Sequence, residues 1–202
     1  MTIFRTLAIV LAIILGPSLS AQNWEFIKEK NGIKIYTRKE AGNEIKSFRG
    51  IMEIRTTMDR VTHLVGNVHN HDWWDENVKD IQILYFEENK HFKYYLLYDV
   101  PWPLSDRDLC VDATVTVDPL TGRREILAKP IENMVPEKED VVRIKKYWQK
   151  WTIQPLDKGM VRLVLEGSVD PGGSVPSWLY NMVITDTPLR VMNGVKDRVE
   201  IK

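Results

Sequence analysis

The chain has 202 residues, of which 44% are hydrophobic and 28% are charged, and its formal net charge is zero. This composition is typical of one globular domain that is long enough to bury a substantial core. Because acidic and basic residues balance, nothing indicates the basic surface that binds nucleic acid, and no nucleic-acid partner is expected.

Residues 1–21 are typical of a secretory signal peptide. One early arginine precedes an apolar run over residues 7–15, which is followed by a Gly-Pro pair and small side chains. The run is too short to be a stable membrane anchor, so we expect cleavage after Ser20 or Ala21. The prediction is a mature domain over residues 22–202 that is exported to the periplasm or secreted.

Helices and strands are expected in a definite order along the mature chain. The spacing of apolar residues predicts an amphipathic helix over 23–32, ending at an Asn-Gly turn, and a second helix over 57–68. Alternation of apolar and polar residues predicts strands over residues 33–39, 44–54, 78–87, 91–100, 108–117, 124–129, 141–153 and 160–169. A long helix is expected over 175–200, with Ser174 as its cap and a kink at Pro188.

Consecutive antiparallel strands joined by turns, with helices on one face of the sheet, predict an α+β fold in a single domain. A kinked helix over a curved sheet need not fill the space between the two, so an internal apolar cavity is expected. Alternation along the strands and position on the helix assign these residues to the cavity: Tyr94, Leu96, Tyr98, Val111, Ala113, Val115, Leu163, Leu165, Trp178, Met182, Val183, Leu189 and Met192.

Little in the sequence predicts catalysis or metal binding. Cys110 is the only cysteine and is expected to be a small buried side chain. His69, His71 and Asp72 form the one cluster that could ligate a metal, but a zinc site usually draws a further ligand from elsewhere in the chain. We interpret the cluster as a polar helix start, and expect no metal, no cofactor and no catalytic residue.

Residues 138–151 mix basic and aromatic side chains. Our interpretation is a solvated strand face with Trp148 or Trp151 packed inside. Weak contact with anionic lipid head groups is the alternative, and it would suit a protein that loads its ligand from a membrane.

Residues 98–111 read YDVPWPLSDRDLCV, with prolines on both sides of Trp102 and a charged run before an apolar segment. This pattern fits either a catalytic cluster or a structural corner at the mouth of a cavity.

Four segments, taken in order, resemble the START domain family, the steroidogenic-acute-regulatory-protein-related lipid-transfer module. They are NGIKIYTR (31–38), the pair Trp73-Trp74, PWPLSDRDLC (101–110) and GGSVPSWLYN (172–181). The resemblance covers most of the mature chain and is to a secreted, single-domain member of bacterial type. It implies a helix-grip fold, in which an antiparallel sheet wraps around a C-terminal helix and encloses an apolar tunnel for a lipid.

The resemblance favours the structural corner over catalysis. In the family this corner starts a central strand, so Arg107 is expected to pair with its neighbouring acids or with loop backbone, and direct contact with the ligand is the alternative. Some sterol-type members place a buried arginine six residues further on, where this chain has Ala113. A sterol held by that arginine is therefore not expected, and Tyr94 and Tyr98 are the better candidates for polar contacts.

The leading hypothesis is a monomeric, exported protein that binds a lipid or another hydrophobic small molecule for transport or sensing, with transient membrane contact. An acyl chain exposed to water costs about 0.8 kcal/mol per CH₂, so a carrier must supply apolar walls and a movable lid. One alternative is a helix-grip superfamily enzyme, cyclase-like or hydrolase-like, which would need a titratable pair in a cavity where the sequence supplies only tyrosines. The other alternative is an interaction domain with no ligand.

Overall fold

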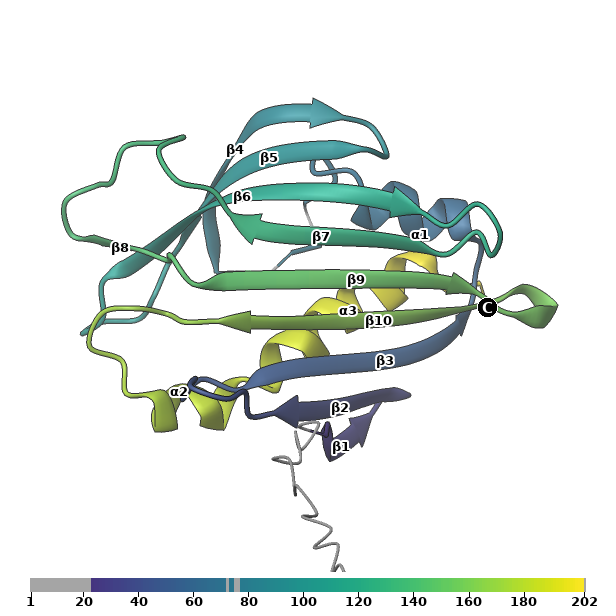
Figure 1. Cartoon of the computed structure of the whole chain (residues 1–202), viewed down its shortest axis with the longest axis horizontal. Helices are drawn as coiled ribbons and strands as arrows, with labels where there is room; N and C mark the ends of the chain where they lie inside the picture. Colours follow the sequence, from purple (N-terminus) through teal and green to yellow (C-terminus); the bar gives the residue numbers. More distant parts are fainter. Residues whose placement is uncertain (1–22, 72, 75–76, 202) are drawn as a thin grey trace, which may run out of the picture.

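The computed structural model describes residues 23–71, 73–74 and 77–201 (Figure 1). The strands are β1 (Glu25–Lys30), β2 (Ile33–Arg38), β3 (Ser47–Arg55), β4 (Val78–Glu87), β5 (His91–Tyr98), β6 (Asp106–Val117), β7 (Arg124–Pro130), β8 (Val141–Arg143), β9 (Tyr147–Pro155) and β10 (Met160–Val169). The helices are α1 (Met58–Val65), α2 (Ser177–Val183) and α3 (Asp186–Val199), and a 3₁₀ turn, η1, spans Asp157–Gly159.

All ten strands of the described residues belong to one open sheet. Its order is β1-β2-β3-β10-β9-β7-β6-β5-β4, and neighbours on this path are antiparallel. β8 lies off the path and pairs with β6 in parallel. α3 crosses one face of the sheet (Figure 1), which confirms the predicted α+β arrangement. No helix within the described residues is both long and apolar enough to cross a membrane.

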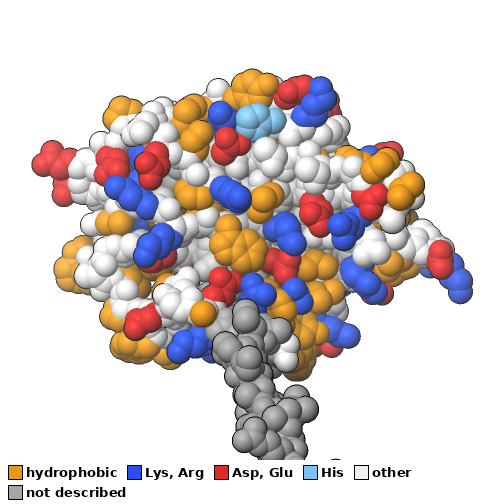
Figure 2. All heavy atoms as spheres, in the orientation of Figure 1, with side chains coloured by type: hydrophobic (Ala, Val, Ile, Leu, Met, Phe, Trp, Pro, Cys, Tyr) orange, Lys and Arg blue, Asp and Glu red, His pale blue; other side chains and the backbone are white. Residues whose placement is uncertain are grey.

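The face of the sheet away from α3 carries charged side chains of both signs (Figure 2). Arg49 on β3 donates to Glu166 on β10, with a shortest distance of 2.6 Å, and the Nζ of Lys150 on β9 lies 3.1 Å from the same carboxylate. Trp151, next to Lys150, points the other way and is buried. This alternation is the one expected for a solvated strand face with a tryptophan packed inside.

The predicted N-terminal helix over 23–32 is wrong. The structure has β1 there instead, paired with β2 across the Asn31-Gly32 turn. Asn31 and Gly32 have φ values of 56° and 77°, the left-handed pair that joins two strands of a hairpin, so the turn that we interpreted as a helix end reverses a strand. The short, largely exposed segment gains ladder hydrogen bonds from β2 that an isolated helical turn would lack.

The predicted strand over 141–153 is two strands, β8 and β9. The backbone N–H of Ile144, just after β8, donates to the carbonyl of Asp108 on β6 at 2.8 Å. This bond keeps the first segment beside β6 before the chain turns into β9, which lies between β7 and β10. The remaining predicted strands agree with the structure to within a few residues.

The predicted C-terminal helix over 175–200 is interrupted. α2 ends at Val183 and α3 begins at Asp186, so the break comes before Pro188, which sits in the first turn of α3. Proline is tolerated there because the N–H groups of a first helical turn have no partner within the helix, and Pro188 therefore does not kink α3. Ser174 lies outside α2, whose first turn has no side-chain cap.

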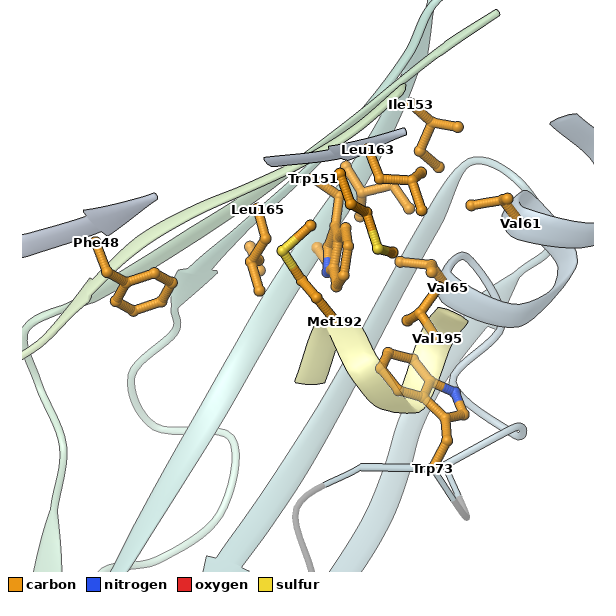
Figure 3. Close-up of a cluster of buried hydrophobic side chains, with 14 of the residues drawn as sticks. Phe48, Val61, Val65, Trp73, Trp151, Ile153, Leu163, Leu165, Met192 and Val195 are labelled. Carbon is orange, nitrogen blue, oxygen red and sulfur yellow. The ribbon is translucent and has the colours of Figure 1, made fainter. Parts of the chain in front are cut away.

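α3 packs closely on the sheet at Gly50 of β3. Met192 and Val195 of α3 are fully buried, in a cluster that includes Leu165 and Trp151 (Figure 3). A Cβ atom placed on Gly50 would lie 2.3 Å from the Sδ of Met192. The Met192 side chain can lie this close to β3 because residue 50 has no side chain.

We predict that Gly50→Ala lowers the free energy of unfolding by about 1–3 kcal/mol, because the added methyl group overpacks the contact with Met192. Denaturant titration followed by tryptophan fluorescence measures the change. In a Met192→Ala background the same substitution should cost clearly less, since the clashing atom is gone. Equal costs in the two backgrounds would contradict the close approach as the reason for the glycine.

Candidate functional site

A cavity of about 530 Å³ lies between the sheet and the helices. Its walls come from the inner faces of β5, β6, β7 and β9, from the Trp73-Trp74 segment, and from α2 and α3. The residues that line it include Phe48, Trp73, Trp74, Phe92, Tyr94, Leu96, Tyr98, Arg107, Leu109, Ala113, Ile126, Ala128, Tyr147, Gln149, Trp151, Leu179, Tyr180, Val183 and Val191.

The hollow in the sheet's inner face follows from two small side chains. Ala113 on β6 and Ala128 on β7 are partners in the antiparallel ladder, and both are buried. Two methyl groups on adjacent strands leave space above the sheet that larger side chains would occupy. The aromatic residues of β5 and β9 stand around this space as walls, because their strands present alternate residues to the same face.

Part of the predicted cavity lining is found where the sequence placed it. Tyr94, Leu96, Tyr98, Ala113 and Val183 all border the cavity, and so does Arg107. Contact between these residues and a ligand stays a prediction.

The predicted position on the cavity wall is corrected for four residues close to α3. Leu163, Leu165, Leu189 and Met192 belong to the buried core and do not border the cavity. Figure 3 shows Leu163, Leu165 and Met192 within a cluster of buried side chains. The physical reason is that α3 lies directly on β3 and β10, so side chains on that half of the sheet pack against the helix and leave no space. Alternation identifies the buried face of a strand but not what covers it.

Two predicted residues of β6 also do not border the cavity. Val111 is fully buried opposite Tyr94 in the β5–β6 ladder. Val115 lies further along the strand, where its N–H donates to the carbonyl of Lys90 in the β4–β5 turn at 2.7 Å.

Trp178 and Met182 are surface residues, which corrects their predicted place in the cavity. Their exposed fractions are 66% and 70%. They lie four residues apart on one face of α2, whereas Leu179 and Val183 share the face that borders the cavity. The prediction assumed one continuous helix, in which these two residues would share the inward face of α3. Instead, α2 is a separate short helix at the mouth of the cavity.

Sequence reasoning missed several lining residues. Tyr147, Gln149 and Trp151 alternate along β9, and this alternation would have placed them on the same face. Tyr180 borders the cavity because it lies on the inner side of α2, which was not predicted as a separate helix. Nothing in the sequence pattern assigns Trp74 to the cavity, because it lies between elements.

The polar groups of the cavity are mainly tyrosine hydroxyls. Tyr94, Tyr98, Tyr147 and Tyr180 line the cavity, and the Tyr147 hydroxyl donates to the Oε1 of Gln149 at 3.2 Å. Burial raises the pKa of Tyr94, Tyr147 and Tyr180 above the usual range. These hydroxyls are therefore neutral at physiological pH and can donate hydrogen bonds.

Alternation at the start of β6 separates Arg107 from Asp108. Arg107, 5% exposed, faces the cavity and donates to backbone only, from Nη1 to the carbonyl of Ser105 and from Nε to that of Pro171 at 3.4 Å. The burial lowers the pKa of Arg107. This is the loop-backbone pairing that was expected of a structural corner.

Asp108 points to the opposite face of the sheet and is fully buried. Its carboxylate accepts two hydrogen bonds from Arg143, at 2.6 and 2.9 Å, and one from the Tyr95 hydroxyl at 3.2 Å. Cys110, on the same face, is also buried as predicted, and burial raises the pKa of its thiol. The ion pair ties β8 to β6 and stiffens the strand that carries Arg107.

Exposed apolar side chains surround the mouth of the cavity. Pro101 and Leu104, from the β5–β6 connection, and Leu179 and Val183, from α2, all border the cavity and are exposed. Trp102, 92% exposed, lies in the same connection, and Trp178 and Met182 lie on the outer side of α2. We call the side chains of Trp102, Leu104, Trp178, Leu179, Met182 and Val183 the rim.

The histidine cluster makes contacts with aromatic rings. The ring centroids of His69 and Phe86 lie 4.8 Å apart, and those of His71 and Trp74 lie 6.2 Å apart. Asp72 lies outside the described residues, so the prediction that this cluster binds no metal stays a prediction. Within the described part of the chain, no group of three or more His, Cys, Asp or Glu residues could hold a metal ion.

The START domain family model matches residues 8–201, and the chain therefore belongs to this family. The phosphatidylcholine transfer protein of Mus musculus is 30% identical over 190 residues, which cover 91% of this chain and 86% of that protein. The crystal structure of a STAR-related lipid transfer protein from Xanthomonas axonopodis is similar with a TM-score of 0.77 at 26% identity, covering 86% of this chain and 97% of that one.

Human StAR-related lipid transfer protein 5 has the same fold, with a TM-score of 0.76 at 20% identity over 89% of this chain and 87% of that one. The structural similarities and the observed topology together confirm the helix-grip fold.

We predict that Asp108→Asn lowers the free energy of unfolding by about 3–5 kcal/mol, because it leaves the guanidinium of Arg143 buried without a counter-charge. Thermal and denaturant unfolding measure the loss. The matched control is Glu53→Gln, which removes the partner of Arg162 in an exposed pair and should cost less than about 1 kcal/mol. Similar small losses in both variants would show that the buried pair does not stabilise the corner.

Proposed function

We propose that this protein binds a lipid or a similar hydrophobic molecule in its cavity and carries it between membranes. The observation that carries the proposal is the 530 Å³ cavity, whose walls are mainly apolar and aromatic and whose polar groups are few. Sites of this kind bind small molecules by burying their apolar surface and orienting them through a small number of hydrogen bonds. The names of the relatives, which include phosphatidylcholine transfer protein, support a lipid as the ligand class.

The nature of the cavity walls favours a carrier over an enzyme. Among the described lining residues only Asp99 and Arg107 are charged, and Asp99 lies exposed at the mouth, 3.2 Å from Lys79. General acid–base catalysis needs a titratable group within hydrogen-bond reach of the reacting atoms, and the buried tyrosines have raised pKa values that make them poor bases.

The rim supports loading directly from a membrane. Trp102 on one side of the mouth and Trp178 and Met182 on the other are large, exposed and apolar, as is typical of side chains that insert at a membrane surface. A lipid that moved through this mouth while the rim was inserted would pass from bilayer to cavity with little exposure of its chain to water.

We also propose that the protein works as a monomer outside the cytoplasm. One chain supplies all the walls of the cavity, so the proposal needs no second copy. Export is supported by the early arginine, the apolar run and the small residues of segment 1–21. N-terminal sequencing of the protein from fractionated cells tests this part.

We predict that Ala113→Trp weakens lipid binding by at least roughly tenfold while the melting temperature changes little, because the indole occupies ligand space. In a solid core the same change would cost about 1–3 kcal/mol or more of stability. Uptake of a fluorescent lipid and thermal unfolding are measured together, and native mass spectrometry of the wild type reports the bound ligand. Thr114→Trp, one residue along β6 on the exposed face, is the control and should bind normally.

Two outcomes would contradict the carrier proposal. One is a wild-type protein that takes up no lipid. The other is an Ala113→Trp protein that is strongly destabilised while its folded fraction binds lipid as the wild type does, because Ala113 would then be ordinary core.

A second prediction concerns the rim. Trp102→Ser with Trp178→Ser should slow lipid transfer between vesicles by about tenfold, since each exposed tryptophan that inserts contributes on the order of 1–2 kcal/mol of apolar burial. The amount of lipid bound at equilibrium should stay the same, because neither indole borders the cavity. Leu120→Ser is the control, an exposed apolar residue in the β6–β7 turn. An equal loss of rate in the control would contradict a specific role of the rim.

A further inference from the structure

The size of the cavity limits the ligand. An apolar protein cavity of about 150 Å³ accepts one benzene ring, which corresponds to about 25 Å³ per non-hydrogen atom. By this measure a cavity of 530 Å³ holds a molecule of roughly 20 non-hydrogen atoms. A single long acyl chain with a small head group is of this size, whereas a phospholipid with two such chains is more than twice as large.

Arg107 gives the cavity a buried positive charge. Arg107 is only 5% exposed. The two hydrogen bonds described above go to neutral backbone carbonyls. No carboxylate among the described residues lies within ion-pair distance of its guanidinium. The charge of the neighbouring Asp106 acts on Arg107, but Asp106 forms its ion pair with Lys79. Because a buried charge is costly unless it is closely paired, an anion beside the guanidinium of Arg107 would be favoured.

The acidic residues closest in sequence to Arg107 are engaged elsewhere. Asp108 binds Arg143 on the other face of the sheet. Asp106 lies 3.3 Å from Lys79 and accepts from the N–H of Val100 at 3.2 Å. Asp99 also binds Lys79. Arg107 is the one cation of the described lining, and no described acidic residue forms an ion pair with it. An anionic ligand can therefore supply that ion pair.

Tyrosine side chains share the cavity with Arg107. Tyr98 is its direct partner in the β5–β6 ladder, so the two side chains stand next to each other on the inner face. Tyr180 borders the same cavity from α2. The planar guanidinium presents several N–H donors in a fixed fork, which matches the two oxygens of a carboxylate.

We propose that the ligand is a single-chain amphiphile with a carboxylate head, a long-chain fatty acid, whose head binds Arg107 near the mouth and whose chain lies over Ala113 and Ala128. The inference rests on the proposed lipid-carrier function and adds the class of lipid to it. It assigns Arg107 a role in binding in addition to its backbone contacts at the corner.

The test compares palmitate with hexadecanol, which has the same chain length and a neutral head group, and with a two-chain phospholipid. Palmitate, hexadecanol and vesicles of dioleoylphosphatidylcholine are offered to the wild type at pH 8, and binding is measured by displacement of a fluorescent probe and by native mass spectrometry. Palmitate should bind at least tenfold more tightly than hexadecanol, and dioleoylphosphatidylcholine should not be extracted in stoichiometric amount.

Arg107→Gln keeps a hydrogen-bond donor for the backbone carbonyls but removes the charge. It should abolish the preference for palmitate over hexadecanol and leave hexadecanol binding within about twofold. Arg107→Lys should keep part of the preference. Arg162→Gln removes a cation from the outer face of the sheet and should keep all of it, which excludes an effect of net charge.

Several results would overturn the inference. Equal affinity of the wild type for palmitate and hexadecanol would remove the anion site, and this comparison needs no variant to fold. An equal loss of both ligands in Arg107→Gln would leave Arg107 with only its structural role, and preferred uptake of dioleoylphosphatidylcholine would refute the limit on size. If the wild type binds none of the three probes, the carrier proposal itself fails, which is distinct from binding without preference for the acid.

Discussion

The close packing of α3 on one half of the sheet determines what the rest of the structure can do. Gly50 lets Met192 approach β3, and the helix then covers β3 and β10 as a solid core. Because α3 packs on that half of the sheet, it does not also cover β5, β6 and β7. The inner face there is apolar but is lined by the small side chains of Ala113 and Ala128, so a cavity remains. The same interaction thus produces both the stable part of the molecule and the space for a ligand.

The corner between β5 and β6 connects this space to the surface. Strand alternation sends Arg107 inward and Asp108 outward, and the outward ion pair with Arg143 fixes β6 and β8 from behind. The cavity side of the corner therefore has a rigid strand, a cation and a tyrosine, while its solvent side has the exposed Trp102. One face of the strand carries the stabilising ion pair and the other face lines the cavity, so charged residues can occur in a row without any catalytic role.

Sequence patterns predicted the fold class and most strands, since alternation is a strong signal on β5 and β6, and the family resemblance implied the helix-grip fold. The predictions were wrong where one sequence pattern is compatible with two different structures. The Asn31-Gly32 pair can end a helix or join two strands, and only the pairing partner decides. Pro188 was predicted to kink the helix, although a proline with an acidic residue two positions before it, here Asp186, also indicates the first turn of a new helix.

The candidate site was predicted less well than the fold. Period-2 alternation gave Tyr94, Leu96, Tyr98 and Ala113 correctly as inward-facing and cavity-lining. It also assigned Leu163 and Leu165 to the cavity, and this was wrong. The sequence does not show which strands α3 covers, and α3 packs on β10, where these two residues lie. Trp178 and Met182 were assigned to the cavity on the assumption that residues 175–200 form one helix. The break between α2 and α3 shows that this assumption was wrong.

The central claim is that the hollow over Ala113 and Ala128 holds the apolar part of a ligand. The most direct measurement is NMR of the protein with ¹³C-labelled alanine and methionine methyl groups and an unlabelled lipid, in which through-space contacts identify the methyl groups that touch the chain. We expect contacts from the lipid chain to the methyl groups of Ala113 and Ala128. Contacts confined to Met182 on the rim, with none at the two alanines, would show that lipid binds at the surface and that the cavity is not the site.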